Sequence, residues 1–345
     1  MAAEDGRPRV VVRPPNWLGD AVLALPALAA VRRHFSDAHL TIAAAPAVAA
    51  VFREETDATP DEVIDLPGGS RAAIAALRAG RFDVAVLLPN SFGSAWQVWR
   101  ARIPERWGYR TAGRGWLLTR RARPPRGWRR RHQAEYYRDL ALGLGLSPAD
   151  ERPRLAPTAA SRAQAETLVA AVPGRGPLIG LAAGAAYGQA KQWPPDRMAA
   201  VAARLIEQHG ATVVLVGAAH DRDAARAIES WLRLHAPGAA GRLVNLAGRT
   251  SLGALIGLIA RMTTFFSNDS GAMHVAAALG CPVVAIFGPT DERRTKPLGD
   301  QAVLHADVFC RPCMLRDCPI DHRCMKRVTV EDVYAAVSAR LDARP

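Results

Sequence analysis

The chain has 345 residues, of which 49% are hydrophobic and 22% are charged. It is longer than one typical domain and too hydrophobic for a disordered protein, so we expect two folded domains, each with its own core. The formal net charge of +13 indicates an anionic partner or surface.

Short apolar segments alternate with helical patterns through the N-terminal half. This alternation predicts an α/β domain in which helices cover both faces of a parallel sheet. The predicted strands are 9–13, 39–43, 62–66 and 83–88, and the predicted helices are 21–35, 46–54, 71–79, 92–102 and 133–142.

A polar loop, Asn16-Trp17-Leu18-Gly19-Asp20, follows the first predicted strand. Ligands of doubly wound sheets bind at the carboxyl ends of the strands, where this loop is expected. Asp20 is the leading candidate for a catalytic carboxylate, because the helix N-terminus favours its ionised form, which can take a proton from an attacking hydroxyl. The alternative is that Asp20 only caps the helix.

The segment 100–132 is densely basic and interleaved with tryptophans, and Glu105 is its only acidic residue. Such a composition can bind anionic lipid headgroups, an acidic sugar or nucleic acid, or it can be a solvated basic face. No helix-turn-helix, zinc-finger or RNA-recognition signature accompanies it, so we do not expect a nucleic-acid partner.

The proline-rich segment 147–157 is the predicted linker between the domains. We expect one domain at 1–150, a second at 151–328 and a closing helix within 329–345. The second domain is predicted to have strands at 178–182, 212–216, 243–245, 262–267 and 283–287, and helices at 195–209, 222–234, 252–260 and 272–279, before a final helix at 330–341.

Two loops of the second domain have features of phosphate or ribose binding. The first, 183–194, contains glycines and places Lys191 as a point charge just before a helix that begins at Pro194-Pro195. The second contains Asp221, which can accept hydrogen bonds from ribose hydroxyls. The alternatives are a surface role for Lys191 and a helix-capping role for Asp221.

The sequence Asn268-Asp269-Ser270-Gly271-Ala272-Met273-His274 lies between an apolar strand and an Ala-rich helix. Unpaired backbone N–H groups and the helix dipole favour an anion such as a diphosphate at such a junction. The alternative is that Asp269 or Ser270 only caps the helix. Capping alone does not require Gly271 or His274.

Four cysteines follow a C-x2-C-x4-C-x5-C spacing at Cys310, Cys313, Cys318 and Cys324. They fit the ligands of a structural Zn²⁺ or an iron–sulfur centre, and free or redox-active thiols are the alternative. We do not assign them a catalytic role.

The charged N-terminus has no apolar core of a signal peptide, and the apolar runs are short. We therefore expect a soluble cytoplasmic protein that can lie peripherally on a membrane.

Three stretches of the chain resemble glycosyltransferase family 9, the ADP-heptose:lipopolysaccharide heptosyltransferases. They are 16–20, 187–194 and 268–274 with the following Phe287-Gly288-Pro289-Thr290. The first two are more similar to heptosyltransferase II than to heptosyltransferase I. The chain departs from the heptosyltransferase I pattern at Ala186-Tyr187, which replace a hydroxyl-bearing pair.

The resemblance implies a GT-B fold, with two Rossmann-like domains facing across a cleft, and an inverting reaction that needs no metal. Heptose would pass from ADP-heptose to the anionic Kdo/lipid A inner core of lipopolysaccharide at the membrane surface. Asp20 matches the general base, and Asn16, Trp17 and Gly19 lie on its acceptor side. The residues that match the donor site are Lys191, Tyr187, Asp269, Ser270, Gly271 and His274, and Asp221 aligns only loosely with an acidic residue near the ribose.

Two other functions compete with this one. The chain could be another sugar-nucleotide enzyme of the GT-B class, with a different donor or an epimerase activity, which needs no acceptor. It could also be a non-catalytic protein of two domains that binds an anion.

Overall fold

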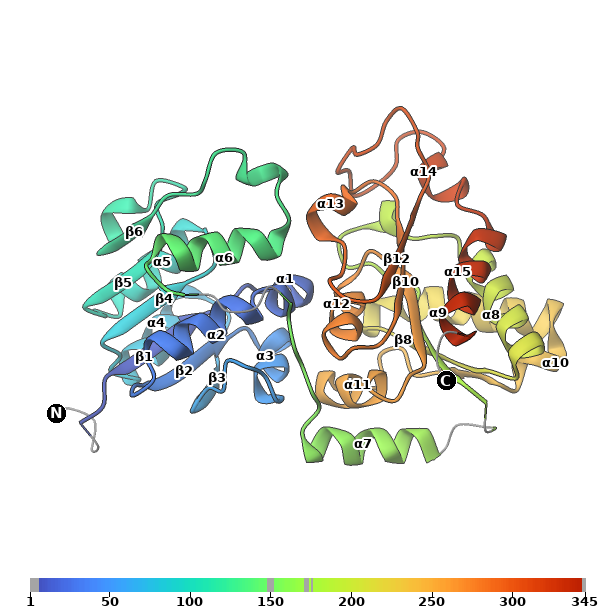
Figure 1. Cartoon of the computed structure of the whole chain (residues 1–345), viewed down its shortest axis with the longest axis horizontal. Coiled ribbons are helices and arrows are strands. Elements are labelled where there is room, and N and C mark those ends of the chain that lie inside the picture. The colour runs from blue at the N-terminus through green and yellow to red at the C-terminus, as the bar shows by residue number, and fades with distance from the viewer. Residues whose placement is uncertain (1–5, 148–151, 171–173, 175, 343–345) are drawn as a thin grey trace. The chain divides into compact units, whose positions relative to one another are not determined.

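The computed structural model describes residues 6–147, 152–170, 174 and 176–342. The chain divides between Leu155 and Ala156 into two compact units, which we call the N-terminal unit and the C-terminal unit. The boundary expected after residue 150 falls outside the described ranges. Each unit contains one six-stranded sheet (Figure 1), and every strand pairing in both sheets is parallel.

The N-terminal sheet has the strand order β3-β2-β1-β4-β5-β6. Central strand β1 is buried because Val10, Val11 and Val12 carry its apolar run between two parallel neighbours. The strands are β1 (Arg9–Arg13), β2 (His39–Ala44), β3 (Glu62–Asp65), β4 (Val84–Leu87), β5 (Glu105–Tyr109) and β6 (Arg120–Ala122), and the helices are α1 (Leu18–Leu23), α2 (Leu25–His34), α3 (Pro46–Arg53), α4 (Ser70–Ala79), α5 (Phe92–Arg100) and α6 (Gln133–Gly143), with the 3-10 helices η1 (Gly115–Leu117) and η2 (Trp128–Arg130).

The single helix predicted at 21–35 is wrong, because the structure has two helices there. Trp17 caps α1, whose first bond runs from the amide of Ala21 to the Trp17 carbonyl at 2.8 Å, so Gly19 and Asp20 are already helical. The helices change over at Ala24 because Pro26 has no amide hydrogen to continue α1. The other four helices and all four strands predicted in this unit are confirmed.

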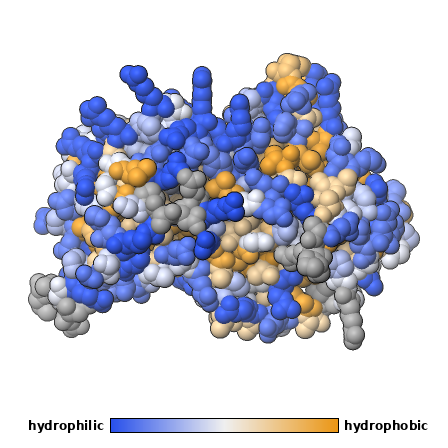
Figure 2. Space-filling model, viewed as in Figure 1, coloured by the Kyte–Doolittle hydropathy of each residue, from blue (hydrophilic) through white to orange (hydrophobic). Residues whose placement is uncertain are grey.

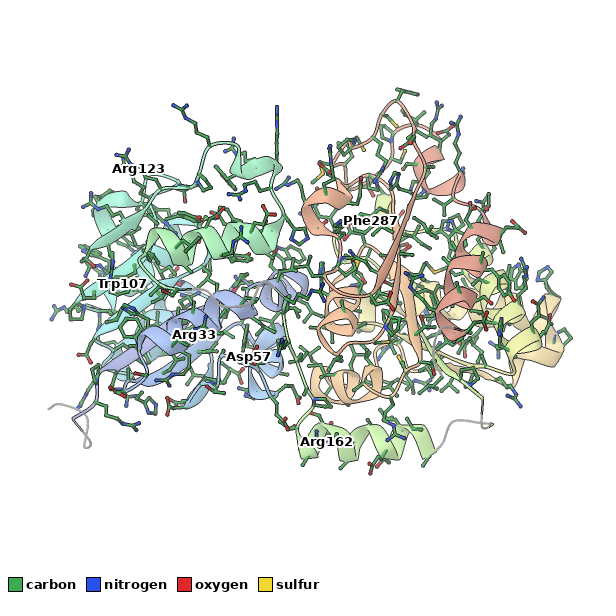
Figure 3. All side chains as sticks on the ribbon, in the orientation of Figure 1. Arg33, Asp57, Trp107, Arg123, Arg162 and Phe287 are labelled. Carbon is green, nitrogen blue, oxygen red and sulfur yellow. The ribbon has the colours of Figure 1, made fainter. Side chains whose placement is uncertain are left out.

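Two strands of the N-terminal unit, β5 and β6, lie inside the basic segment and were not predicted. Their arginines and tryptophans hide the apolar alternation that marks a strand. Trp107 of β5, labelled in Figure 3, is only 7% exposed, and the Arg120 guanidinium lies 4.4 Å from the centre of its ring. The alternative in which the basic segment is only a solvated face therefore does not hold for β5.

The C-terminal sheet has the order β12-β11-β10-β7-β8-β9. It repeats the order of the N-terminal sheet, with β7 in the place of β1 and β10 in the place of β4. The strands are β7 (Leu178–Ala182), β8 (Thr212–Val216), β9 (Leu243–Asn245), β10 (Thr264–Asn268), β11 (Val283–Phe287) and β12 (Gln301–His305), and the helices are α7 (Ala159–Ala170), α8 (Pro195–His209), α9 (Arg222–His235), α10 (Pro237–Ala240), α11 (Leu252–Ile259), α12 (Gly271–Ala278), α13 (Glu292–Thr295), α14 (Arg323–Lys326) and α15 (Val330–Asp342), with the 3-10 helices η3 (Gln189–Lys191) and η4 (Ala219–Asp221).

All five strands and the five helices predicted for the C-terminal half are present, with bounds that differ by two residues at most. Strand β12 was missed because it is a half-exposed edge strand without strict alternation. Helix α15 packs against α8 within the C-terminal unit. Among the described residues, no helix is both long and apolar enough to cross a lipid bilayer.

Both sheets confirm the doubly wound α/β fold predicted from the sequence. In such sheets the order reverses beside the first strand, and the loops that leave the two adjacent strands diverge to form a ligand crevice at their carboxyl ends. The reversal lies between β1 and β4 in one unit and between β7 and β10 in the other. The loops that follow these four strands are therefore the places to look for a site.

Candidate active site

The reversal point of the C-terminal sheet brings Lys191 and Asp269 together. Lys191 lies in η3, after β7, and Asp269 follows β10. The Lys191 Nζ is 2.6 Å from the Asp269 Oδ2, and the side chains are only 12% and 6% exposed. The same Oδ2 accepts a hydrogen bond from the Thr290 hydroxyl at 2.6 Å. A buried carboxylate thus holds the ammonium group at the sheet edge, and the surface alternative for Lys191 is wrong.

The ring of Tyr187 lies close to two cations. The Lys191 Nζ is 4.8 Å from the ring centre and the Arg316 guanidinium is 5.3 Å from it. The Tyr187 hydroxyl donates to the Met314 carbonyl at 2.8 Å, which fixes the ring. Cation–π attraction therefore adds to the ion pair in orienting Lys191, and Arg316 brings a further positive charge to this loop.

The N-terminus of α12 is not capped by a side chain. Ser270 occupies the N-cap position without a side-chain hydrogen bond, and its hydroxyl is buried with no hydrogen-bond partner among the described residues. Asp269 is instead bonded to Lys191 and Thr290, so the capping alternative is wrong for both residues. The first turn, which begins at Gly271, contains no acidic residue and offers backbone N–H groups beside Lys191.

His274 lies one turn inside α12 and is buried. Phe287, labelled in Figure 3, ends the neighbouring strand β11, and the next residues lead to Thr290. The structure thus brings together the predicted residues of two segments of the C-terminal unit, the loop after β7 with Tyr187 and Lys191 and the β10–α12 junction with Asp269, Ser270, Gly271 and His274.

Asp221 lies apart from this group, after β8. Its Oδ2 accepts from the Ala218 amide at 2.8 Å, and its Oδ1 is 3.3 Å from the His220 Nε2. The carboxylate also packs against the backbone of Gly184 and Gly217, where a Cβ atom would overlap it. Asp221 therefore stabilises its own loop, and the absence of a Cβ atom at Gly184 allows the loop after β7 to lie against it.

Asn268 opens the motif quoted from the sequence, but no role was assigned to it there. It is fully buried, its Oδ1 accepts from the Trp193 amide at 2.9 Å, and its Nδ2 donates to the Ala183 carbonyl at 2.6 Å. The side chain thereby ties the two ends of the 183–194 loop to β10. A polar residue at the end of an otherwise apolar strand was the available signal.

The cysteine-containing segment 309–326 also packs on this site, which the sequence did not indicate. The Arg311 Nε donates to the Gly288 carbonyl at 2.6 Å, and the Ala190 amide donates to the Arg316 carbonyl at 2.8 Å. The His322 Nε2 lies 2.7 Å from the Ala190 carbonyl oxygen. The segment therefore supports the loop that carries Lys191.

None of the four cysteines of this segment forms a disulfide bond. Burial raises the pKa of the Cys324 thiol, and the charges of the Cys310, Cys318 and Cys313 thiols raise it further. Within the described ranges, no three or more His, Cys, Asp or Glu side chains are arranged to hold a metal ion. A structural metal stays a prediction from the spacing.

In the N-terminal unit, Asp20 lies half-buried in the first turn of α1, after central strand β1. Trp17, not Asp20, is the N-cap, so the alternative in which Asp20 caps the helix is wrong. Burial raises the pKa of the Tyr137 hydroxyl, and the negative charge of Asp20 raises it further. Asn16 and Trp17 are exposed, Trp17 to 57%.

The loops after β4 and β5 meet at the same edge through residues that sequence reasoning missed. The Asn90 side chain donates to the Tyr136 hydroxyl and accepts from Thr111 at 3.3 Å. Arg114 is completely buried, donates to the Tyr109 carbonyl at 2.9 Å and to the Ser94 hydroxyl at 3.0 Å, and has its pKa lowered by burial to about 10. An arginine in a basic segment gives no sign that it is buried.

Comparison with known protein sequences finds relatives that are heptosyltransferases. The sequence pattern of glycosyltransferase family 9 (heptosyltransferase) matches residues 70–323. Lipopolysaccharide heptosyltransferase 2 of Salmonella typhimurium is 32% identical over 319 residues, which cover 85% of this chain and 86% of that protein. Lipooligosaccharide heptosyltransferase 2 of Haemophilus influenzae is 31% identical over 314 residues, which cover 86% of this chain and 87% of that protein.

A solved structure shows the same fold. The structure of E. coli ADP-heptose lps heptosyltransferase II matches with a TM-score of 0.81 and 28% identity, and the match covers 96% of this chain and 98% of that one. The GT-B class expected from the sequence is thereby confirmed at the level of two doubly wound parallel sheets.

Proposed function

This chain belongs to glycosyltransferase family 9, the heptosyltransferases, and from that membership we propose that it transfers heptose from ADP-heptose to the inner core of lipopolysaccharide. The observation that carries the proposal is the Lys191–Asp269 pair beside the N-terminus of α12. A fixed cation and a set of backbone N–H groups at one sheet edge suit a sugar diphosphate.

The C-terminal unit would bind the donor. The Asp269 carboxylate occupies one N–H of Lys191 and leaves the others for the diphosphate oxygens. The backbone N–H groups that begin at Gly271, and the Ser270 hydroxyl, would bind the same anion. As the sugar leaves, negative charge grows on the diphosphate, and these fixed groups stabilise it in place of a metal ion.

The N-terminal unit would bind the acceptor and supply the base. Asp20 would take the proton of the acceptor hydroxyl as that oxygen attacks the anomeric carbon of heptose, so the C–O bond to ADP breaks while the new C–O bond forms. Attack from the face opposite ADP inverts the anomeric configuration. Asn16, Trp17 and Gly19 would line the acceptor side, and the anchored acceptor places the reaction at the cytoplasmic membrane surface.

Mass spectrometry of a truncated inner-core acceptor, incubated with ADP-heptose and the protein, tests the proposal. We expect the acceptor to gain one heptose and ADP to appear in equal amount. Donor turnover that proceeds without acceptor would instead indicate an epimerase or hydrolase, and an unchanged acceptor with every core length would contradict the proposal.

A further inference from the structure

Helix α5 of the N-terminal unit carries an aromatic stripe beside its buried face. Ala95 and Val98 lie on the inner face and are fully buried. Phe92, Trp96 and Trp99 repeat at intervals of four and three residues, which places them along one stripe next to that face. A surface helix normally carries polar residues there. Phe92 is nevertheless 42% exposed and Trp99 37% exposed.

Trp116 of η1 extends this stripe to a surface that we call the aromatic patch: Phe92, Trp96, Trp99 and Trp116. Its indole is 59% exposed, and its ring centre lies 6.2 Å from that of Phe92 and 6.0 Å from that of Trp99. The Trp96 and Trp99 centres are 4.9 Å apart. The rings pack against one another, but this packing still leaves Phe92, Trp99 and Trp116 exposed to water. The face drawn in Figure 2 is mostly hydrophilic. A contiguous group of exposed rings on a protein surface indicates an interaction site.

A basic hollow adjoins the patch at Trp99. It measures about 450 Å³ and is lined by Arg78, Trp99, Arg100, Arg102, Ile103, Pro104 and Arg106, with no acidic residue. The Arg106 guanidinium is held by the carbonyls of Leu117 and Ile103, each at 2.6 Å. Arg78, Arg100 and Arg102 are exposed, so an anion can reach their guanidinium groups from outside.

The patch also begins at the functional edge of the sheet. Phe92 starts α5 directly after the loop that leaves β4, and β4 is the neighbour of β1, whose following helix carries Asp20. From there the patch runs along α5 to the basic hollow at Arg100.

We propose that the aromatic patch and the basic hollow dock the protein on an anionic phospholipid bilayer. Trp99 and Trp116 would lie at the level of the headgroups, and Arg100 and Arg102 would bind lipid phosphates. Indoles combine an apolar body with one N–H and favour this interface, and exposed arginines are attracted to anionic lipid. Docking would bring Asp20 to a membrane-anchored acceptor, and this role rests on the proposed function.

Nucleic acid fits the patch less well. A single-strand platform stacks successive bases on free ring faces. Here the rings pack against one another: Phe92 and Trp96 are stacked, with 21° between the planes, and Trp99 and Trp116 meet at 69°. An apolar surface with arginines at one end suits a headgroup layer over acyl chains better than it suits a phosphate backbone.

Vesicle binding by the intact protein tests the proposal, with three double variants. Trp99→Ser with Trp116→Ser alters the patch, and Arg100→Gln with Arg102→Gln alters the hollow. The matched control, Arg233→Gln with Leu234→Ser, removes an exposed arginine and an exposed leucine from α9 of the C-terminal unit. Thermal melts of all three verify folding.

The wild type is expected to sediment with vesicles that contain phosphatidylglycerol and to bind neutral phosphatidylcholine vesicles more weakly. The arginine variant should lose roughly tenfold to thirtyfold in affinity for the anionic vesicles, since each arginine near the surface contributes about a fivefold factor. The tryptophan variant should also lose affinity, because the exposed indoles no longer enter the headgroup layer. The control should bind as the wild type does. Wild-type affinity in both site variants would overturn the proposal, as would a loss of RNA binding in them with vesicle binding intact.

Transfer assays separate this proposal from the proposed function. Docking predicts that the site variants keep wild-type rates on a soluble core fragment and lose rate on the same core anchored in vesicles. A raised KM for the soluble fragment would assign the patch to the glycan and overturn docking. An absence of transfer from the wild type in both assays would refute the enzyme activity, while vesicle binding would still decide the docking surface.

Discussion

At the carboxyl end of β10, Asp269 binds Lys191 and Thr290 through a single oxygen while the side chain is almost completely buried. A buried carboxylate costs free energy unless it is paired, and so does a buried ammonium group. The pair therefore satisfies both charges before any ligand arrives. In the proposed function it also holds the cation at the place where diphosphate charge develops.

The Lys191–Asp269 pair can be tested by removing one partner and then both. Lys191→Met leaves Asp269 buried and unpaired, so we expect a loss of about 3 kcal/mol in the free energy of unfolding and a loss of ADP binding. Lys191→Met with Asp269→Asn should recover much of the stability but no ADP binding. Denaturant unfolding and calorimetry measure these two effects, and Lys326→Met is the surface control. Equal ADP affinity in the wild type and Lys191→Met would remove Lys191 from the donor site.

Asp20 is tested by the substitution Asp20→Asn, which keeps the size of the side chain and removes its basicity. A general base contributes a factor of about 10² to 10⁴, so we expect kcat to fall by that much while ADP binding stays unchanged. The exposed Asp37→Asn is the matched control. Turnover by Asp20→Asn at the wild-type rate would exclude Asp20 as the base.

Among the elements, the segment 309–326 has an effect that its sequence does not show. It supports the loop before α8 through backbone contacts at Gly188 and Ala190. Gly188 lies so close to Arg316 that a Cβ atom would overlap the Arg316 carbonyl oxygen. The donor loop and the cysteine segment are therefore packed as one surface.

Gly188→Ala tests this packing. The added methyl group must displace the Arg316 backbone, which should lower the free energy of unfolding by about 1 to 3 kcal/mol and weaken ADP binding because Lys191 lies in the next turn. Thermal melts and calorimetry with ADP measure both effects. Gly238→Ala, where a Cβ atom meets nothing within 4 Å, is the control. ADP affinity that is unchanged in Gly188→Ala would show that the two segments act separately.

The cysteines carry a separate prediction from their spacing. If they hold a structural metal, elemental analysis of the purified protein should find roughly one equivalent of zinc or iron per chain. Cys310→Ser with Cys313→Ser should then release the metal and lower the melting temperature. A folded, active and metal-free sample would contradict the prediction.

At the scale of the whole molecule, the chain contains two units with the same strand order, each with one reversal point. The proposed function assigns the donor to one and the acceptor to the other. A duplicated architecture is compatible with this division, because each doubly wound sheet has its own crevice at the carboxyl ends of its strands.

Hydrogen exchange of the intact protein tests this division. ADP should slow exchange in 183–194 and 268–274 of the C-terminal unit, because a bound ligand protects the amides that it contacts. A core acceptor should slow exchange in 16–20 of the N-terminal unit. Protection by ADP that falls mainly in 16–20 would reverse the assignment.

Much of this protein follows from short-range patterns. Strand β1 and the pair β10–β11 are apolar runs bounded by polar turns, and their order with the intervening helices determines a doubly wound sheet. The sequence also located the candidate residues, because Asp20, Lys191 and Asp269 each follow a predicted strand. Local pattern is enough for these conclusions, since strand and helix periods are properties of neighbouring residues.

Other features depended on the tertiary structure. That Lys191 and Asp269 share a 2.6 Å contact follows from the pairing of β7 with β10, which no local pattern encodes. The burial of Arg114 and the exposure of Trp116 likewise run against their residue types. Whether a side chain is a core residue, a ligand or a surface anchor depends on what long-range packing places around it, and that energy is not contained in any short stretch of the chain.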